Sequence, residues 1–183
     1  MRKALSFAVL AAAITLTTTP AYAQVESGHW KVFNYKDKAP PNGLGDNTTI
    51  SIDQTPAGDY TGTFLKYNPW AATLQFITLN TDEGSTLYLV KPGDIISNAT
   101  KAHLTSFSQA SLKTLKVGWD FYLAVATTSF SDPGFSWQNL SHSTSFGWAH
   151  FKMNWLGKLT IVDSAMAFRE TGIVVGKLQA APQ

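Results

Sequence analysis

Residues 119–126 alternate between two sets of side chains with a period of two, and this pattern constrains the fold more than any other feature of the chain. One set is apolar and the other is mixed: Trp119, Phe121, Leu123 and Val125 against Asp120, Tyr122, Ala124 and Ala126. Because successive side chains of an extended strand point to opposite faces of a sheet, the alternation predicts a strand. Residues 146–153 alternate in the same way and predict a second strand.

Short segments of strand character recur along the chain, separated by turn sequences rich in Pro, Gly, Asn and Asp. We predict strands at residues 30–35, 48–53, 60–67, 73–79, 86–90, 119–126, 146–153, 159–168 and 173–178. Residues 91–116 are less regular, and we expect a covering loop there with at most one or two helical turns. The pattern predicts an all-β fold, an antiparallel β-sandwich that is jelly-roll-like. No linker or repeat divides it, so we expect one domain over residues 24–183.

The chain contains no cysteine, which excludes disulfides, thiol catalysis and cysteine-ligated metal sites. Such a domain depends on its apolar core alone, and about 160 residues can bury roughly 70% of the unfolded surface. The 11 Phe, 6 Trp and 6 Tyr residues provide much of the material for that core.

Residues 1–23 have the pattern of a secretory signal peptide. Arg2 and Lys3 precede an apolar run that ends near Leu16, and Ala21-Tyr22-Ala23 has the small-x-small form that signal peptidase cleaves. The apolar run is shorter than the roughly 20 residues that span a bilayer. We therefore expect cleavage after Ala23 and a secreted or periplasmic protein whose mature chain has no membrane span.

Removal of the signal peptide changes the charge balance. Without Arg2 and Lys3, the 14 basic residues become 12, which equals the 12 acidic residues. Nucleic acids and anionic membranes require a basic surface, and no run of Lys or Arg stands out in the sequence. We therefore expect neither as a partner.

Four segments of the carboxyl-terminal half form a recognisable set: residues 119–125 (WDFYLAV), 146–152 (FGWAHFK), 159–168 (LTIVDSAMAF) and 172–176 (GIVVG). Together they resemble the body of secreted bacterial proteins of the PEP-CTERM type. The family implies a Gram-negative source and a link to extracellular polysaccharide and biofilm matrix, and it implies no catalytic residues. Its Val-Pro-Glu-Pro sorting signal and membrane anchor have no counterpart after Leu178, so we expect a free product.

Few residues suggest catalysis. The four histidines, His29, His103, His142 and His150, show neither helical i, i+4 spacing nor a His-Glu-x-x-His motif. No Gly-x-Ser-x-Gly sequence is present. We expect His150 to be an exposed sheet residue on the face opposite Phe151 and Met153.

A glycan-active enzyme would need a carboxylic acid, and the strands offer Asp120, Asp163 and Glu170. Asp120 shares a face with Tyr122, whereas Asp163 falls in phase with apolar Leu159 and Ile161, where burial would raise its pKa. We favour a structural role for Asp163, at a strand bend or paired with Arg169 or a backbone donor.

No metal site or cofactor is predicted. Asn80, Asp82 and Glu83 form one oxygen-rich cluster that could ligate calcium, and Asp46-Asn47 forms another. Neither has the spacing of an EF-hand loop, and such clusters are typical of ordinary turns.

Aromatic residues suggest binding more strongly, because their rings stack on the apolar faces of sugars. Trp70 and Trp137 follow turn sequences and are our candidate ligand-binding residues, although we favour a loop-anchoring role for each. Trp30, Trp119 and Trp148 lie in predicted strands, where we expect core positions.

The leading hypothesis is a secreted, non-enzymatic protein of the envelope or extracellular matrix that binds polysaccharide. One alternative is a glycan-active jelly-roll hydrolase or lyase with Asp120 or Asp163 as the acid. Another is a structural or assembly component whose sheet edges pair with partners.

Overall fold

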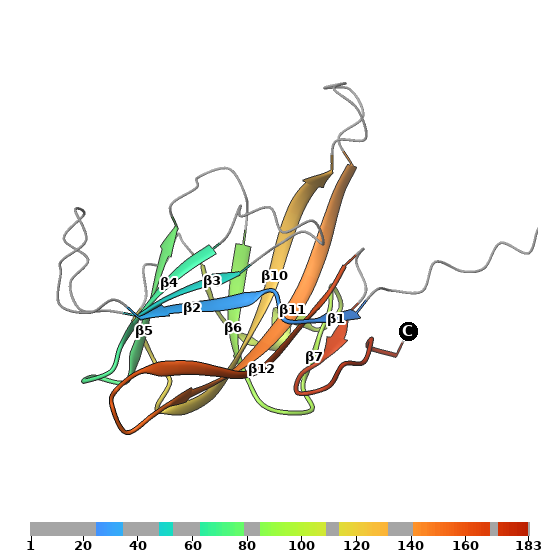
Figure 1. Cartoon of the computed structure of the whole chain (residues 1–183). Coiled ribbons are helices and arrows are strands. Elements are labelled where there is room, and N and C mark those ends of the chain that lie inside the picture. The colour runs from blue at the N-terminus through green and yellow to red at the C-terminus, as the bar shows by residue number, and fades with distance from the viewer. Residues whose placement is uncertain are drawn as a thin grey trace, which may run out of the picture.

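The structure, a computed structural model, describes residues 25–34, 48–52, 63–78, 85–108, 114–131, 141–168 and 172–182. It confirms the predicted all-β fold, with antiparallel sheets and no α-helix in these ranges (Figure 1). No helix of the described part is long and apolar enough to cross a membrane. The predicted signal peptide lies outside the described residues.

The larger sheet has six strands in the order β1-β12-β11-β10-β6-β8. They are β1 (Val25–Ser27), β12 (Leu159–Ala167), β11 (Ser141–Met153), β10 (Asp120–Ser131), β6 (Ser85–Val90) and β8 (Thr105–Ser108). Every pair is antiparallel, and β10 and β11 stay in register from Asp120 opposite Lys152 to Ser131 opposite Ser141. This long hairpin forms the centre of the sheet.

The second sheet has five strands in the order β2-β3-β4-β5-β9. They are β2 (Trp30–Asn34), β3 (Thr48–Ile52), β4 (Thr63–Asn68), β5 (Thr73–Thr78) and β9 (Thr114–Lys116). A separate pair joins β7 (Ile95–Ile96) to β13 (Ile173–Val174), and η1 (Lys101–His103) is a single 3₁₀ turn. The jelly-roll detail is unconfirmed, because β2 to β5 form a meander within one sheet.

Most of the predicted strands are confirmed, with ends that differ by a few residues. The prediction for residues 173–178 is wrong in length, since only Ile173–Val174 pair as a strand. Within residues 91–116, the single turn of η1 agrees with the predicted covering segment. The three short strands β7, β8 and β9 in that segment, and β1, were not predicted.

The main core lies between the two sheets. Its buried residues come from both: Trp30, Ile50, Ile52, Leu65, Tyr67, Leu74, Leu87, Phe121, Leu123, Val125, Ala149, Phe151, Leu159, Met166 and Phe168. Three ring contacts run through it, from Trp30 to Phe151 at 5.9 Å, from Phe151 to Phe121 at 5.2 Å, and from Phe121 to Tyr67 at 5.8 Å. These contacts link the two sheets through the core. In a domain without disulfides, such aromatic packing stabilises the arrangement of the sheets.

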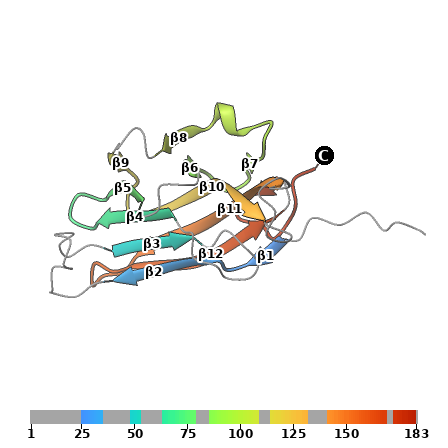
Figure 2. The same cartoon turned by 90° about the horizontal axis from the view of Figure 1, so that it is seen from above.

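A second apolar cluster covers part of the outer face of the six-stranded sheet. It contains Tyr88, Val90, Ile96, Ala124, Ala126, Phe146, Trp148, Ala165, Ala167, Ile173 and Val175. Residues from β7 and β13 provide the cover, and Figure 2 shows β7, η1 and β8 on the side away from β2. Trp148 is 1% exposed, and its indole N–H donates to the backbone oxygen of Lys177 at 3.0 Å. The central strands are therefore buried on both faces at mid-length.

Gly147 marks the tightest approach in the sheet, and it offers a test of the fold. A Cβ at Gly147 would stand 2.9 Å from the backbone oxygen of Ala165 and would collide with the sulfur of Met166 on β12. We expect Gly147→Ala to lower the free energy of unfolding by about 1–3 kcal/mol, because overpacking forces neighbours to shift. Urea denaturation measures the change, and an unaltered midpoint would contradict the close approach of β11 and β12.

Candidate functional site

Three exposed tryptophans stand on neighbouring turns at one end of the sandwich. Trp70 lies between β4 and β5 and is 95% exposed, Trp119 directly precedes β10 and is 64% exposed, and Trp155 lies between β11 and β12 and is 91% exposed. Figures 1 and 2 both show these three connections at the same end of the molecule. We call Trp70, Trp119 and Trp155 the tryptophan end.

Backbone hydrogen bonds join the three turns. The N–H groups of Val117 and Gly118 donate to the oxygen of Ala72, at 3.1 and 3.3 Å. The N–H of Met153 donates to the oxygen of Trp119 at 2.8 Å. The loop that carries Trp119 is thus attached on one side to the β4–β5 turn and on the other to the end of β11. The three turns of the tryptophan end are therefore linked through their backbones.

An asparagine side chain braces each of the two outer turns. The Oδ1 atom of Asn68 accepts from the N–H of Trp70 at 3.0 Å. The Oδ1 atom of Asn154 accepts from the N–H groups of Leu156 and Lys158, at 3.0 and 2.9 Å. Asparagine favours such turns because its short amide satisfies backbone groups a few residues ahead. These bonds order the backbone of both turns, while the rings of Trp70 and Trp155 are open to solvent.

The core holds the central turn in place through Tyr67. The Tyr67 side chain is fully buried, and its hydroxyl donates to the backbone oxygen of Gly118 at 3.0 Å. Burial raises the pKa of this phenol, so it stays protonated and keeps its role as donor. Gly118 has a φ of +85°, a value that favours glycine and lets the chain turn sharply before Trp119.

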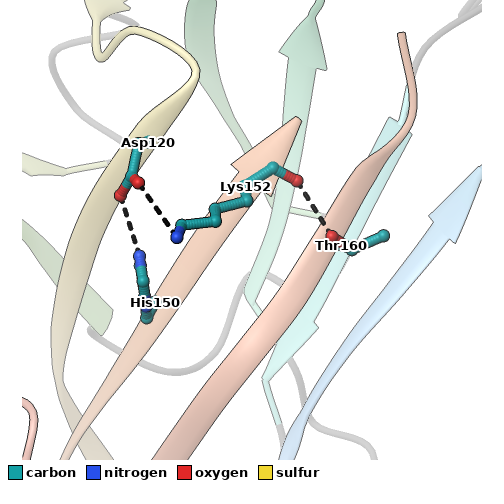
Figure 3. A network of polar contacts seen from close by, with 4 residues as sticks. All are labelled: Asp120, His150, Lys152 and Thr160. Atoms are coloured by element: carbon teal, nitrogen blue, oxygen red, sulfur yellow. Dashed lines mark hydrogen bonds and ion pairs between the residues drawn. The ribbon is translucent and has the colours of Figure 1, made fainter. Parts of the chain in front are cut away.

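A polar network begins beside Trp119, on the outer face of the six-stranded sheet (Figure 3). Asp120 accepts from Nε2 of His150 at 2.8 Å, and Nζ of Lys152 lies 3.4 Å from its other oxygen. On the next strand, the Thr160 hydroxyl donates to the backbone oxygen of Lys152 at 3.0 Å. The hydrogen bond from His150, aided by Lys152, lowers the pKa of Asp120. Asp120 is therefore an ionised, oriented acceptor that remains 58% exposed.

The prediction for His150 was correct in its face and wrong in its exposure. The side chain points to the outer face, as the alternation with Phe151 and Met153 implied, but it is only 12% exposed. Its ring stacks on Tyr122, with centroids 4.1 Å apart and planes inclined by 6°. Tyr122 covers the imidazole and thereby orients it toward Asp120.

The prediction that Asp163 shares the face of Leu159 and Ile161 is wrong. The register of β11 against β12 shifts between His150 and Phe151, so that His150 stands opposite Asp163 while Phe151 stands opposite Ile161. This bulge at Val162 turns Asp163 to the exposed outer face. There Oδ1 of Asp163 accepts from the N–H of Ser164 at 2.8 Å, which agrees with the structural role favoured above.

Asp120 and Asp163, the two described candidates for the acid, do not have the properties of a general acid. A general acid needs a raised pKa and partial burial, whereas the pKa of Asp120 is lowered and the residue is largely exposed. Asp163 is also exposed. Glu170 lies outside the described residues. Within the described ranges, no group of three or more His, Asp or Glu residues could hold a metal ion.

The sequence predicted the positions of some tryptophans correctly and of others wrongly. Trp30 and Trp148 are buried as predicted, but the core position predicted for Trp119 is wrong because β10 begins one residue later. Trp137 lies outside the described residues, as do both candidate calcium clusters. Trp155 was missed, since a turn has no periodicity; its position after a turn-forming asparagine is the signal that could have found it.

No protein-family model matches the chain, and neither a curated protein nor a solved structure matches it. The residues of the tryptophan end and of the adjoining network must themselves indicate the chemistry of the site.

The pKa of Asp120 tests the polar network. A lowered folded-state pKa means that the network stabilises the fold at pH values above the ordinary 3.8, and that this contribution disappears as the pH falls through the lowered value. We expect His150→Leu to raise the pKa of Asp120, because leucine has no donor and the largest cause of the lowering is lost. A carboxyl-carbon NMR titration of both proteins measures it. An Asp120 pKa at or above 3.8 in the unaltered protein would contradict the network.

Proposed function

We propose that the protein is exported and binds polysaccharide without catalysis, in the cell envelope or the extracellular matrix. The observation that carries the proposal is the exposure of three tryptophans on adjoining, braced turns. Single exposed apolar residues are common on protein surfaces, but a contiguous group rimmed by polar residues is typical of an interaction site. The resemblance of the carboxyl-terminal half to PEP-CTERM-type proteins supports the matrix as the place of action.

Indole rings suit sugars because the axial C–H groups of a pyranose form an apolar patch that packs on an aromatic face. Binding is weakened when a site must first be ordered, since immobilising side chains and loops costs free energy. The amide braces of Asn68 and Asn154 and the Tyr67 hydrogen bond reduce that cost, because the turns are ordered in advance. A long polymer could contact several tryptophans at once.

The Asp120 network supplies the polar part of such a site. The carboxylate is adjacent to Trp119 in sequence, ionised and held by two donors, so it can still accept hydrogen bonds from sugar hydroxyls. Lys152 is 51% exposed and can donate to hydroxyl oxygens. The lowered pKa of Asp120 argues against this residue as a general acid and is compatible with a binding role for it.

Affinity electrophoresis in gels containing soluble polysaccharides tests the proposal. We expect at least one polysaccharide of a neutral and acidic panel to retard the protein. Trp70→Ala, Trp119→Ala and Trp155→Ala should each weaken that binding about tenfold, which corresponds to about 1.4 kcal/mol. Because Trp70 and Trp155 are almost fully exposed, these two changes should leave the melting temperature nearly unaltered.

Leu178→Ala is the matched control, since Leu178 is 60% exposed and distant in sequence from the three turns. Tryptophan also favours membrane interfaces, so sedimentation with phosphatidylglycerol vesicles is the competing measurement. Vesicle binding without glycan binding would overturn the proposal. Failure to bind any glycan or vesicle would also overturn it and leave the structural or assembly role.

A further inference from the structure

Lysines accompany the tryptophans on two of the three adjoining segments. Residues 69–72, 116–120 and 152–158 contain three lysines, Lys116, Lys152 and Lys158, and a single acid, Asp120. Lys116 stands three residues before Trp119 and pairs with Thr73 at the start of β5, so it lies next to the turn of Trp70. The N–H of Lys158 donates to Oδ1 of Asn154, and the oxygen of Lys158 accepts from the N–H of Asn154. These two bonds close the turn that carries Trp155. Backbone hydrogen bonds thus bring segments that carry positive charge to the same end of the sandwich, although they are far apart in the sequence.

The negative charge of Asp120, the single acid of these segments, is already offset by neighbouring donors. Asp120 is bonded to His150 and paired with Lys152. Lys116 and Lys158 take part in no ion pair within the described ranges. Their ammonium groups therefore leave a local excess of positive charge on a chain whose predicted mature form is neutral as a whole. Such an excess attracts anionic ligands and is screened by salt.

We propose that the tryptophan end selects acidic polysaccharides, whose sugar rings carry carboxylate groups. This inference rests on the proposed function and specifies its ligand class. The indoles would stack on the ring faces, and the ammonium groups of Lys116 and Lys158 would pair with carboxylates at the ring edges. A lysine ammonium acts as a compact point charge on a flexible stem, so it suits a polymer with repeated and variably placed carboxylates.

The experiment compares two polymers with the same backbone, polygalacturonate and its fully methyl-esterified form. Isothermal titration calorimetry at low salt should show about tenfold tighter binding of the acid than of the ester, a difference of one decade in Kd. The preference should shrink at roughly 0.5 M salt, where charges on the surface are screened. The Lys116→Gln/Lys158→Gln double variant should bind the two polymers equally.

Lys101→Gln is the matched control, because Lys101 lies on η1 away from the tryptophan end and bonds to Asn98 at 2.8 Å. This control should keep the full preference for the acid. Equal binding of acid and ester by the unaltered protein, or an unchanged preference in the double variant, would overturn the inference and leave the proposed function standing. Single-stranded DNA that displaces polygalacturonate at equal phosphate and carboxylate concentration would overturn the selectivity for acidic sugars. Binding of neither polymer nor any neutral glycan would overturn both proposals.

Discussion

The two-sided burial of β10 and β11 is the constraint on which the rest of the structure depends. Phe121 and Leu123 pack against the second sheet, while Ala124 and Trp148 pack under the covering segments on the opposite face. A one-residue slip would exchange the two sets, so that large side chains would face the covering segments and small alanines would face the second sheet. The register of this hairpin therefore fixes where every neighbouring strand and turn must lie.

The candidate site occupies the part of that framework that the two apolar clusters leave uncovered. Beyond Tyr122, the outer face of the sheet turns polar, and Asp120, His150 and Lys152 form their network there. The sandwich ends directly beside it, in the turns of the tryptophan end. Tyr67 connects the two regions, since it stacks on Phe121 in the core and donates to the turn before Trp119. Tyr67 thus contributes both to the packing of the core and to the position of the turn that carries Trp119.

The sequence predicts the parts of this structure that are governed by periodicity. Long alternating runs such as residues 119–126 and 146–153 predict strands well, because many side chains agree on one face. Strands of two to four residues, such as β7 and β8, carry too few side chains for any period. The errors at Trp119 and Asp163 have local causes: a strand that begins one residue later than its pattern, and a bulge that inserts Val162. Neither feature can be recognised from the spacing of apolar residues in the sequence.

Ligand binding at the tryptophan end can be observed directly at the indole N–H groups. Each of the six tryptophans contributes one indole N–H signal to a ¹H–¹⁵N spectrum, and titration with oligogalacturonate reports which indoles change environment. We expect shifts for Trp70, Trp119 and Trp155, with the signals of buried Trp30 and Trp148 unchanged. A titration that saturates while the three exposed indoles keep their positions, or one that produces no shift at all, would contradict this expectation.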